Sequence, residues 1–533
     1  MQRSVSFITI LFFLLLILSS CKDSGHYDII IRNGEVLDGN GTAAIKVDVA
    51  INGDEIVKLT DLSNATANLE IDAQGKIISP GFVDLHAHLE PIFELNNCES
   101  HLRQGITTAI GGPDGRGPLP FGRYVDSLSN KGIGMNAGFL CGHNSIRANV
   151  MELENRAPTP EELDQMKSLV RQSMEEGAFG ISTGLKYLPG TFSKIDEVIT
   201  LSKVAADKGG IYTSHLRDEG LKLLDGVNEA IQIGKEANIP IVLTHHKVVG
   251  KPMWGSSHKT MALIDSARAV GIDVMADQYP YAASYTGIGI LIPSWARAGG
   301  NGKFIQRVQD PQLRDSIHKK IVFNIINDRG GDDLDRVQFA RVRWDTTLQG
   351  KTLKYWCERE GLEVTHENGA DLIIRAQVNG GCTCIFHAMD DLDVANIMSH
   401  PYTAVATDGR LTKLGENFVH PRNYGTFPRV LGKYVREEGV LTLPEAIRKM
   451  TSFPADRMGL ANRGRIAAGK KADIVIFDAD TISDKGTFIA PHAYPVGIDH
   501  VLVNGKMAIH NGEFSDQLNG VVLKGPAYSG ELD

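Results

Sequence analysis

The sequence predicts an α/β fold: a (β/α)8 barrel of the TIM type, with a small β-sandwich formed from both chain ends and an insertion between strands 7 and 8. Three observations lead to this prediction. Short apolar runs alternate with helical patterns through the middle of the chain, polar ligand-type residues follow several of these runs, and both chain ends carry short strands with Asn-Gly turns. With 533 residues, 42% hydrophobic and 22% charged, the chain has the size and composition of a large folded protein.

The amino terminus differs from the rest of the chain. Arg3 precedes an apolar run at 7–18, which is short for a bilayer span and typical of a signal peptide. The run ends Leu18-Ser19-Ser20-Cys21, which resembles the bacterial lipobox. We therefore predict a lipoprotein-type signal peptide over 1–21 and export to the cell envelope, with a lipid at Cys21 as the contact with the membrane. An ordinary signal peptide, or a short membrane anchor, is the alternative.

The charge distribution argues against nucleic acid as a partner. The formal net charge is −9 and the basic residues are dispersed, so the sequence lacks the clustered Lys and Arg that bind nucleic acid. We expect a small-molecule substrate.

The five cysteines after Cys21 have no paired spacing and predict buried, unpaired thiols rather than a disulfide framework. They are Cys98, Cys141, Cys357, Cys382 and Cys384.

The two chain ends predict one composite β-sandwich over 26–79 and 458–533. Its signals near the amino terminus are short apolar runs with Asn33-Gly34 and Asn52-Gly53, dipeptides that favour hairpin turns. Short apolar runs of the same kind lie near the carboxyl terminus, at 472–477 and 501–503.

Residues 80–457 predict the barrel. One of its helices begins with the capping box Thr159-Pro160-Glu161-Glu162 and ends before Gly177, and another begins at Thr442. The gap between the last two strands is too long for one crossover, so we predict an insertion subdomain at 283–370; an independent domain is the alternative. The eight expected strands lie near 81–88, 106–112, 135–142, 178–184, 210–215, 240–246, 272–279 and 402–408.

The first of these strands predicts a metal site. His86 and His88 have strand spacing, which puts both imidazoles on one face about 7 Å apart. A lone His-x-His is more often structural, but three later runs end in His215, in His245-His246 and in Asp408. In a barrel, these ends all open onto the carboxyl-end face, where the chemistry of such enzymes takes place.

Further motifs resemble those of the amidohydrolase superfamily and, within it, those of the D-aminoacylases. The resemblance covers nearly the whole chain after the signal peptide. It rests on Pro80-Gly81-Phe82 before the first histidines, Gly142-His143-Asn144-Ser145, Ser182-Thr183-Gly184-Leu185, His215-Leu216-Arg217-x-Glu219, His245-His246-Lys247, Asp277-x-Tyr279-Pro280-Tyr281, His420-Pro421-Arg422-x-Tyr424-Gly425 and Gly464-Arg465-Ile466.

The resemblance implies a role for each matching residue. His86, His88, His215 and His245 would bind one zinc ion or a zinc pair, and Asp408 would act as general base and then general acid. Strand parity and the offset of thirty residues from His215 favour His245 over His246 as the ligand. The resemblance further implies that the substrate carboxylate is bound by Lys247, Tyr279 and Arg422.

One ligand position departs from the family pattern. D-aminoacylases carry a metal-binding cysteine after the second strand, where this sequence has Asp114. Asp114 would be a harder ligand that widens metal preference toward manganese, or else a turn residue within Pro-Asp-Gly. Other superfamily members bridge two metals with a carboxylated lysine, and Lys186 is the candidate for that alternative.

The implied function is metal-dependent hydrolysis of N-acyl-D-amino acids to a carboxylate and a free D-amino acid. A cyclic-amide hydrolase of the dihydroorotase or hydantoinase type, or a dipeptidase, could use the same site. An anchored binding lipoprotein without catalytic activity is the alternative from a different class.

Overall fold

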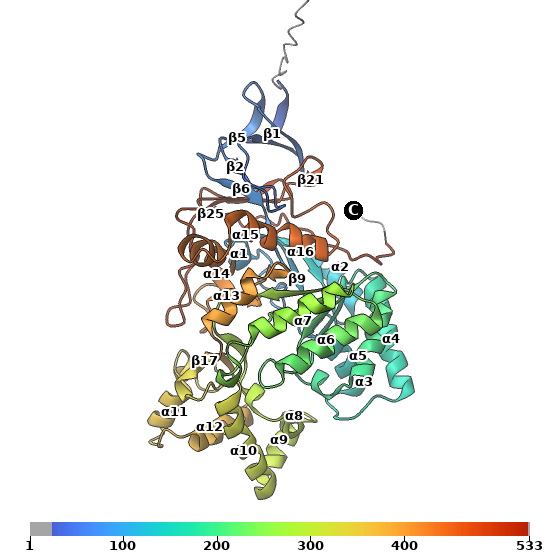
Figure 1. Cartoon of the computed structure of the whole chain (residues 1–533), viewed down its shortest axis with the longest axis vertical. Coiled ribbons are helices and arrows are strands. Elements are labelled where there is room, and N and C mark those ends of the chain that lie inside the picture. Colours follow the sequence, from blue (N-terminus) through green and yellow to red (C-terminus); the bar gives the residue numbers. More distant parts are fainter. Residues whose placement is uncertain (1–23, 531–533) are drawn as a thin grey trace, which may run out of the picture.

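The computed structural model describes residues 24–530 (Figure 1). The predicted signal peptide and Cys21 lie outside the described residues. Between residues 24 and 530, no helix combines the length and the apolar character needed to cross a bilayer.

Parallel strands occupy the middle of the chain, and each of the eight predicted runs contains one. They form a three-stranded sheet, β10-β9-β7, and a six-stranded sheet, β11-β12-β13-β14-β15-β19. A parallel pair, β20 (Gly409–Arg410) with β8 (Ala87–His88), continues β19 and β7. The strands are β7 (Phe82–Asp84), β9 (Ile106–Gly111), β10 (Asn136–Phe139), β11 (Cys141–Gly142), β12 (Gly180–Gly184), β13 (Ile211–His215), β14 (Ile241–Leu243), β15 (Val274–Gln278) and β19 (Thr403–Val405).

Helices connect these strands, and both predicted helix starts are confirmed. Thr159 caps the longest of them, because its side chain accepts from the Glu162 amide while the Glu162 carboxylate accepts from the Thr159 amide. Thr442 caps a second helix in the same position. The helices are α1 (Glu99–Leu102), α2 (Phe121–Lys131), α3 (His143–Met151), α4 (Pro160–Glu175), α5 (Ile195–Ala206), α6 (Leu223–Ala237), α7 (Ser257–Ala269), α13 (Asp391–Ser399), α14 (Arg422–Arg429), the π-helix η6 (Val430–Glu437), α15 (Leu443–Met450) and α16 (Ser452–Arg457), with 3-10 turns η1 (Gly190–Phe192) and η2 (Lys251–Met253).

Both chain ends contribute to two further sheets, ordered β21-β4-β3-β1-β5 and β2-β6-β22-β23-β24-β25. One buried apolar cluster contains Ile31 and Val49 from the first sheet and Ile78, Ile474 and Leu502 from the second. The strands are β1 (His26–Arg32), β2 (Glu35–Val36), β3 (Asp48–Asn52), β4 (Glu55–Thr60), β5 (Thr66–Asp72), β6 (Ile77–Pro80), β21 (Lys470–Lys471), β22 (Ile474–Phe477), β23 (Ile498–Val503), β24 (Lys506–His510) and β25 (Glu513–Phe514).

The turn predictions have a mixed outcome. The predicted turn at Asn52-Gly53 joins antiparallel partners, β3 with β4, and Asn504-Gly505, which follows the apolar run 501–503, joins β23 with β24 in the same way. The hairpin predicted at Asn33-Gly34 is wrong, because β1 and β2 belong to different sheets. A side chain at residue 34 would meet Ile78 at 2.3 Å, so the glycine permits a close approach between segments instead of a hairpin.

Two segments of the predicted carboxyl-terminal β unit lie elsewhere. Residues 478–497 contain no strand, and residues 515–530 run beside the parallel strands. There the Ala137 amide donates to Val521 and the Leu523 amide donates back to Ala137, at 3.0 and 2.8 Å. The last segment therefore satisfies backbone groups of β10 that the sequence pattern could not reveal.

The chain between β15 and β19 forms a unit with its own apolar cluster, far from the terminal sheets (Figure 1). Its three-stranded sheet has the order β16-β18-β17. The predicted end at residue 370 falls inside helix α12, and because β18 is the central strand, the unit extends to residue 386. Its elements are β16 (Ser284–Gly287), η3 (Ile288–Leu291), α8 (Ser294–Arg297), α9 (Asn301–Gln309), α10 (Pro311–Asn327), η4 (Leu334–Arg336), β17 (Val337–Arg341), η5 (Thr346–Leu348), α11 (Leu353–Arg359), α12 (His366–Val378) and β18 (Thr383–Phe386).

Candidate active site

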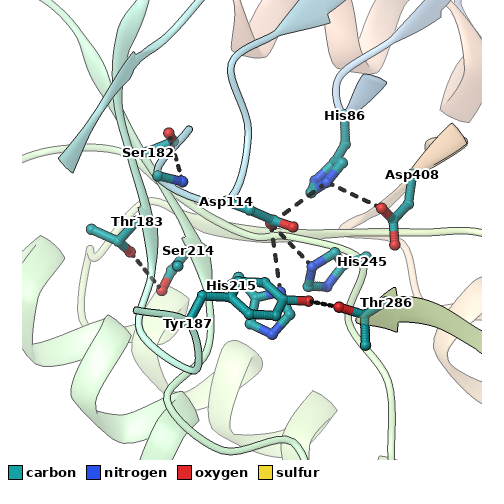
Figure 2. A network of polar contacts seen from close by, with 12 residues as sticks. His86, Asp114, Ser182, Thr183, Tyr187, Ser214, His215, His245, Thr286 and Asp408 are labelled. Carbon is teal, nitrogen blue, oxygen red and sulfur yellow. Dashed lines mark hydrogen bonds and ion pairs between the residues drawn. The ribbon is translucent and has the colours of Figure 1, made fainter. Parts of the chain in front are cut away.

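Two groups of metal-ligand side chains meet at the carboxyl ends of the parallel strands (Figure 2). The first group is His86, His88, Asp114 and Asp408, and the second is Asp114, His215 and His245. Within each group, the ligand atoms lie within 4.8 Å of one another. Asp114 belongs to both groups, so its carboxylate lies between two possible metal positions.

The separations between these atoms fit coordination of a metal ion. Asp114 Oδ1 lies 3.2 Å from His245 Nε2, 3.5 Å from His215 Nδ1 and 3.7 Å from His86 Nε2. Asp408 Oδ1 lies 3.2 Å from His88 Nε2 and 3.5 Å from His86 Nε2. Four ligands arranged tetrahedrally around zinc at about 2.0–2.1 Å would be about 3.3 Å apart.

The chemistry of the donor atoms also fits a metal. His86 and His215 are buried, and neither ring nitrogen of either residue has a hydrogen-bond partner within the described chain. Buried polar atoms without partners are costly and uncommon. A divalent ion would give His86 Nε2 and His215 Nδ1, the nitrogens that face Asp114, a partner, and imidazole and carboxylate are ligands that zinc accepts.

Several of these residues follow their strands instead of lying within them. β14 ends at Leu243 and β19 at Val405, whereas we expected His245 and Asp408 to be strand residues. His245, Asp408 and Asp114 have φ angles of 37°, 47° and 55°. Such left-handed backbone is unfavourable for most residues and is found at functional sites, where surrounding contacts hold it in place.

Two buried carboxylates that the sequence analysis did not assign hold this backbone. Asp84 accepts from the amides of His86 and Thr407, at 3.1 and 3.0 Å, and so ties the first ligand loop to the last. Asp277 accepts from the His245 amide at 2.6 Å. The available signal for Asp84 was its position as the one charged residue in an otherwise apolar run.

The contacts of the histidine pair after β14 separate its two members. His245 faces Asp114, whereas Nε2 of His246 lies 2.8 Å from the Thr260 hydroxyl on α7. The choice of His245 agrees with this geometry. Strand parity was the wrong reason, because both residues lie beyond the end of the strand.

Glu219 lies behind two of the candidate ligands. Its carboxylate is 3.4 Å from His215 Nε2 and 3.3 Å from His245 Nδ1, the ring nitrogens that face away from Asp114. Lys247 and Arg329 complete its buried contacts, with Lys247 Nζ at 2.6 Å. Lys247 Nζ also lies 2.6 Å from His245 Nδ1. Lys247, which we predicted to bind the substrate, therefore contacts a candidate metal ligand and the carboxylate behind it.

The other two residues predicted to bind the carboxylate differ in position. Arg422 is buried, with NH1 2.8 Å from Asp408 Oδ2, while its Nε has no hydrogen-bond partner among the described residues. Tyr279 lies beneath this guanidinium, 4.7 Å from ring centroid to Cζ, and turns its hydroxyl to Met389 Sδ. Tyr285, which we did not predict, lines the pocket in its place.

The surroundings favour the charged form of both central carboxyls. Burial alone would raise the pKa of Asp408, but the Arg422 guanidinium and the nearby imidazoles outweigh it and lower the pKa below its usual value. The pKa of Asp114 is likewise held well below its usual range by His245, His215 and His86 despite burial. Both carboxylates are therefore in the ionised form, which is the form that binds a cation.

Lys186, the alternative bridging ligand, lies outside both ligand groups. Its Nζ contacts Asp218 at 3.2 Å and Asp328 at 3.1 Å. This ion-pair network occupies the ammonium group, and Asp114 takes the shared position between the two groups of candidate ligands.

The ligand cluster opens into a pocket of about 800 Å³. Its lining includes Asp114, Asp408 and Arg422, together with residues of the insertion, Tyr285 and Arg341 among them. A pocket of this size accommodates a small molecule with an extended substituent.

Comparison with known proteins relates the chain over most of its length to deacylases of N-acyl-D-amino acids. Residues 339–509 match the model of the amidohydrolase family. The chain is 35% identical over 502 residues to an N-acyl-D-glutamate deacylase of Alcaligenes xylosoxydans xylosoxydans, which covers 90% of this chain and 93% of that protein.

Two solved structures are similar over nearly the whole chain. A D-aminoacylase with a binuclear metal centre has a TM-score of 0.80 at 31% identity, covering 93% of this chain and 100% of that one. The N-acyl-D-glutamate deacylase of Bordetella bronchiseptica, in complex with zinc and a phosphonate that mimics the tetrahedral intermediate, has a TM-score of 0.79 at 30% identity and covers 94% and 100%. The chain therefore belongs to the D-aminoacylase family of the amidohydrolase superfamily.

Proposed function

We propose that this protein is a metal-dependent hydrolase that cleaves the amide bond of N-acyl-D-amino acids. The observation that carries the proposal is the meeting of three elements in one pocket. These are the two histidine and aspartate groups around Asp114, the ionised Asp408, and the buried Arg422 with a donor left free. The D-selectivity follows the names of the relatives.

The ligands of the proposed zinc ions are His86, His88, His215, His245 and the shared Asp114, and Asp408 is the fourth member of the first group. The cluster provides for one ion or two, and its carboxylate oxygens would also accept manganese. When bound, zinc polarises the acyl carbonyl and lowers the pKa of water.

Asp408 is the proposed proton carrier. Its Oδ1 faces the histidines of the first group, while Oδ2 pairs with Arg422, so one oxygen is held in place and the other faces the cluster. Oδ1 accepts a proton as water adds to the acyl carbonyl, and the carboxyl then donates it to the amide nitrogen as the carbon–nitrogen bond breaks. The products are a carboxylate and the free amine of the amino acid.

Arg422 is the proposed anchor for the α-carboxylate. Its planar guanidinium can pair with Asp408 and still offer Nε to a ligand, since arginine carries five donors. Tyr279 supports this guanidinium through the cation–π contact, and Lys247 Nζ lies 5.6 Å from the centroid of the same ring. Anchoring the carboxylate beside the base would fix which face of the α-carbon points toward each wall and so select a configuration.

We also propose an architecture in which the two parallel sheets are arcs of one closed (β/α)8 barrel. The pairing of β8 with β20 and the donation of the Asp408 amide to the His86 carbonyl at 2.9 Å support closure between the first and last strands. The apolar cluster shared by the two terminal sheets supports a β-sandwich domain, and the separate cluster of 288–386 supports an insertion subdomain.

Export and lipid attachment at Cys21 are a further proposal, supported by the sequence at 1–21. Labelling of the full chain with a radioactive fatty acid, alongside the Cys21→Ser variant, tests it. We expect label and membrane association only with Cys21 present, and label-free, unanchored wild-type protein would contradict the proposal.

The test of the main proposal is metal content together with a panel of substrates. We expect zinc in the purified protein and hydrolysis of N-acetyl-D-amino acids, with their L-enantiomers cleaved at least tenfold more slowly. Cleavage of hydantoins or dihydroorotate alone would favour a cyclic-amide hydrolase, and dipeptides alone a dipeptidase. A metal-loaded protein without activity on any of these would favour the binding lipoprotein.

A further inference from the structure

Two sequence motifs that take no part in the proposed chemistry meet at the backbone that carries Asp114. One is Gly142-His143-Asn144-Ser145, at the start of α3, and the other is Ser182-Thr183-Gly184-Leu185, at the end of β12. Asn144 and Ser182 are both buried, and Ser182 lies beside Asp114 (Figure 2). We call residues 112–115, which include the shared candidate ligand, the Asp114 turn.

The hydroxyl of Ser182 binds the Asp114 turn on both sides of Asp114. Ser182 Oγ donates to the Gly112 carbonyl at 2.6 Å and accepts from the Gly115 amide at 3.1 Å. A hydroxyl suits this position because it donates and accepts at a single atom. A rotation of the turn that moved the Asp114 carboxylate would therefore stretch at least one of these two bonds.

Asn144 restrains the same turn through Gly184. Its side-chain amide accepts from the Gly184 amide at 3.1 Å and donates to the Gly184 carbonyl at 3.0 Å. A side chain at Gly184 would meet the Asp114 carbonyl at 2.3 Å, and a side chain at Gly115 would meet Asn144 Oδ1 at 2.1 Å. The Asp114 turn is thus packed closely between the end of β12 and the first turn of α3.

The direction of the Asp114 carboxylate depends on this backbone. Among residues 24–530, its ion-pair partners within 4.0 Å are histidines of the two ligand groups. Because the same histidines are the candidate metal ligands, they cannot orient the carboxylate independently of the metal. The left-handed φ of 55° at Asp114 must therefore be held by contacts to the turn itself.

We propose that Ser182 and Asn144 are positioning residues of the metal centre, which hold the Asp114 carboxylate between the two ligand groups. The inference rests on the metal site of the proposed function, and neither residue is a ligand in it. Because Asp114 belongs to both groups, loss of either positioning residue should weaken both metal positions. Glu219, in contrast, contacts histidines of the second group only.

The test is titration of the full chain, depleted of metal, with cobalt(II). Competition with a chelator measures affinity, and the visible spectrum of the bound ion reports its coordination. We expect Ser182→Ala and Asn144→Ala each to lower the affinity at least tenfold and to change the spectrum, since supporting contacts typically contribute about 10–100-fold in metal affinity. Ser182→Thr restores the hydroxyl and should return the affinity to within threefold of wild type.

Ser173→Ala is the matched control for the loss of a buried hydroxyl. Ser173 Oγ also donates to a backbone carbonyl, that of Leu169 at 2.8 Å, but it lies on α4, outside the pocket lining. We expect its cobalt affinity to stay within twofold of wild type. Ser182→Cys keeps a side chain of similar size with only a weak donor, and it replaces Ser182→Ala in the test if the alanine variant does not fold.

A double-mutant cycle separates positioning from a general effect on the fold. In an Asp114→Ala background, Ser182→Ala and Asn144→Ala should each change the residual cobalt affinity less than twofold, because the carboxylate that they position is absent. Equal losses with and without Asp114 would overturn the proposal. Wild-type affinity and spectrum in folded Ser182 and Asn144 variants would also overturn it, and thermal unfolding of the metal-free proteins shows which variants are folded.

Metal binding distinguishes this inference from the proposed function. If the expected affinities are found but the wild type hydrolyses no N-acetyl-D-amino acid, only the proposed function is contradicted. If the wild type is an active deacylase and its Ser182 and Asn144 variants bind cobalt as tightly as it does, only the inference is contradicted. A wild type that binds no cobalt contradicts both.

Discussion

Arg422 NH1 lies 2.8 Å from Oδ2 of Asp408, and both side chains are buried. The residue proposed to bind the substrate carboxylate therefore also holds the residue proposed to move the proton. A substitution at Arg422 should consequently act on binding and on turnover together, instead of on binding alone as the sequence implied.

We expect Arg422→Ala to raise KM for N-acetyl-D-amino acids at least tenfold and to lower kcat as well, because Asp408 loses the partner that fixes one of its oxygens. Arg422→Lys should recover part of kcat but little of KM, since lysine keeps the charge but lacks the paired donors. Steady-state kinetics of both variants measure the split. A KM unchanged in Arg422→Ala would remove the residue from the substrate site.

Asp408→Asn should keep the metal and lose the reaction. The amide has nearly the same shape but cannot accept the proton, and general base catalysis typically contributes about 10²–10⁴-fold. We expect kcat to fall by about 10³-fold while zinc content, measured by mass spectrometry, stays within a fifth of wild type. A variant with wild-type kcat would exclude Asp408 as the base.

Asp114 should control metal stoichiometry because it belongs to both ligand groups. We expect Asp114→Ala to bind at least one equivalent less metal or to bind it at least tenfold more weakly. Asp114→Cys should retain zinc and discriminate more strongly against manganese, since a thiolate is a softer ligand than a carboxylate. Competition with a chelator measures both affinities, and wild-type metal content and affinity in Asp114→Ala would show that the residue is only part of a turn.

Glu219→Gln should weaken metal binding without removing a proposed ligand. The Glu219 carboxylate orients His215 and His245 from behind, and losses of such supporting contacts typically cost about 10–100-fold in metal affinity. Glu229→Gln is the control, because Glu229 pairs with Arg217 and lies outside the pocket lining. Thermal unfolding of the metal-free proteins checks that the fold is intact; unchanged affinity in a folded Glu219→Gln would contradict the positioning role.

His101 should contribute to the acid sensitivity of the fold. It is buried, and desolvation lowers its pKa from 6.5 to about 3. Below about pH 6.5, the unfolded chain binds a proton at His101 that the folded chain does not bind. The contribution of His101 to the free energy of unfolding is therefore fully present above pH 6.5 and decreases as the pH falls from 6.5 toward 3. Between pH 7.5 and 5.5, the loss from this one group is about 1.4 kcal/mol.

Urea unfolding of the metal-free protein at these two pH values, with His101→Phe, measures this contribution. We expect the difference in free energy of unfolding between the two pH values to shrink by about 1.4 kcal/mol in the variant, whatever its absolute stability. His26→Phe, on the exposed surface of β1, is the control for loss of an imidazole. An unshrunk difference in His101→Phe would show that His101 is protonated while folded.

The sequence predicted the positions of the candidate ligands better than their surroundings. His86, His215 and Asp408 could be found because each follows an apolar run, and the ends of parallel strands meet at one edge of a sheet. Glu219 stood in a quoted motif without a role, since its function depends on two histidines from different loops. Arg329 lies within the predicted insertion at 283–370, and no spacing rule connects it to Glu219.

The backbone of the site was not predictable from periodicity. A pattern of alternating residues assumes a regular strand, whereas the chain bends at Leu85 and His86 between β7 and β8 and turns left-handed at His245 and Asp408. For the same reason, Tyr279, which we predicted to contact the substrate, does not line the pocket, whereas Tyr285 of the insertion does. Tertiary contacts decide such positions.

The left-handed φ of 55° at Asp114 affects how stable the conformation of this loop is in the metal-free enzyme. Aspartate and asparagine tolerate that conformation better than other side chains with a β-carbon. Cysteine at the same point would depend more on coordination to restrain the loop. Compared with a thiolate, the Asp114 carboxylate thus binds zinc less tightly, but its loop can hold the same conformation before the metal binds.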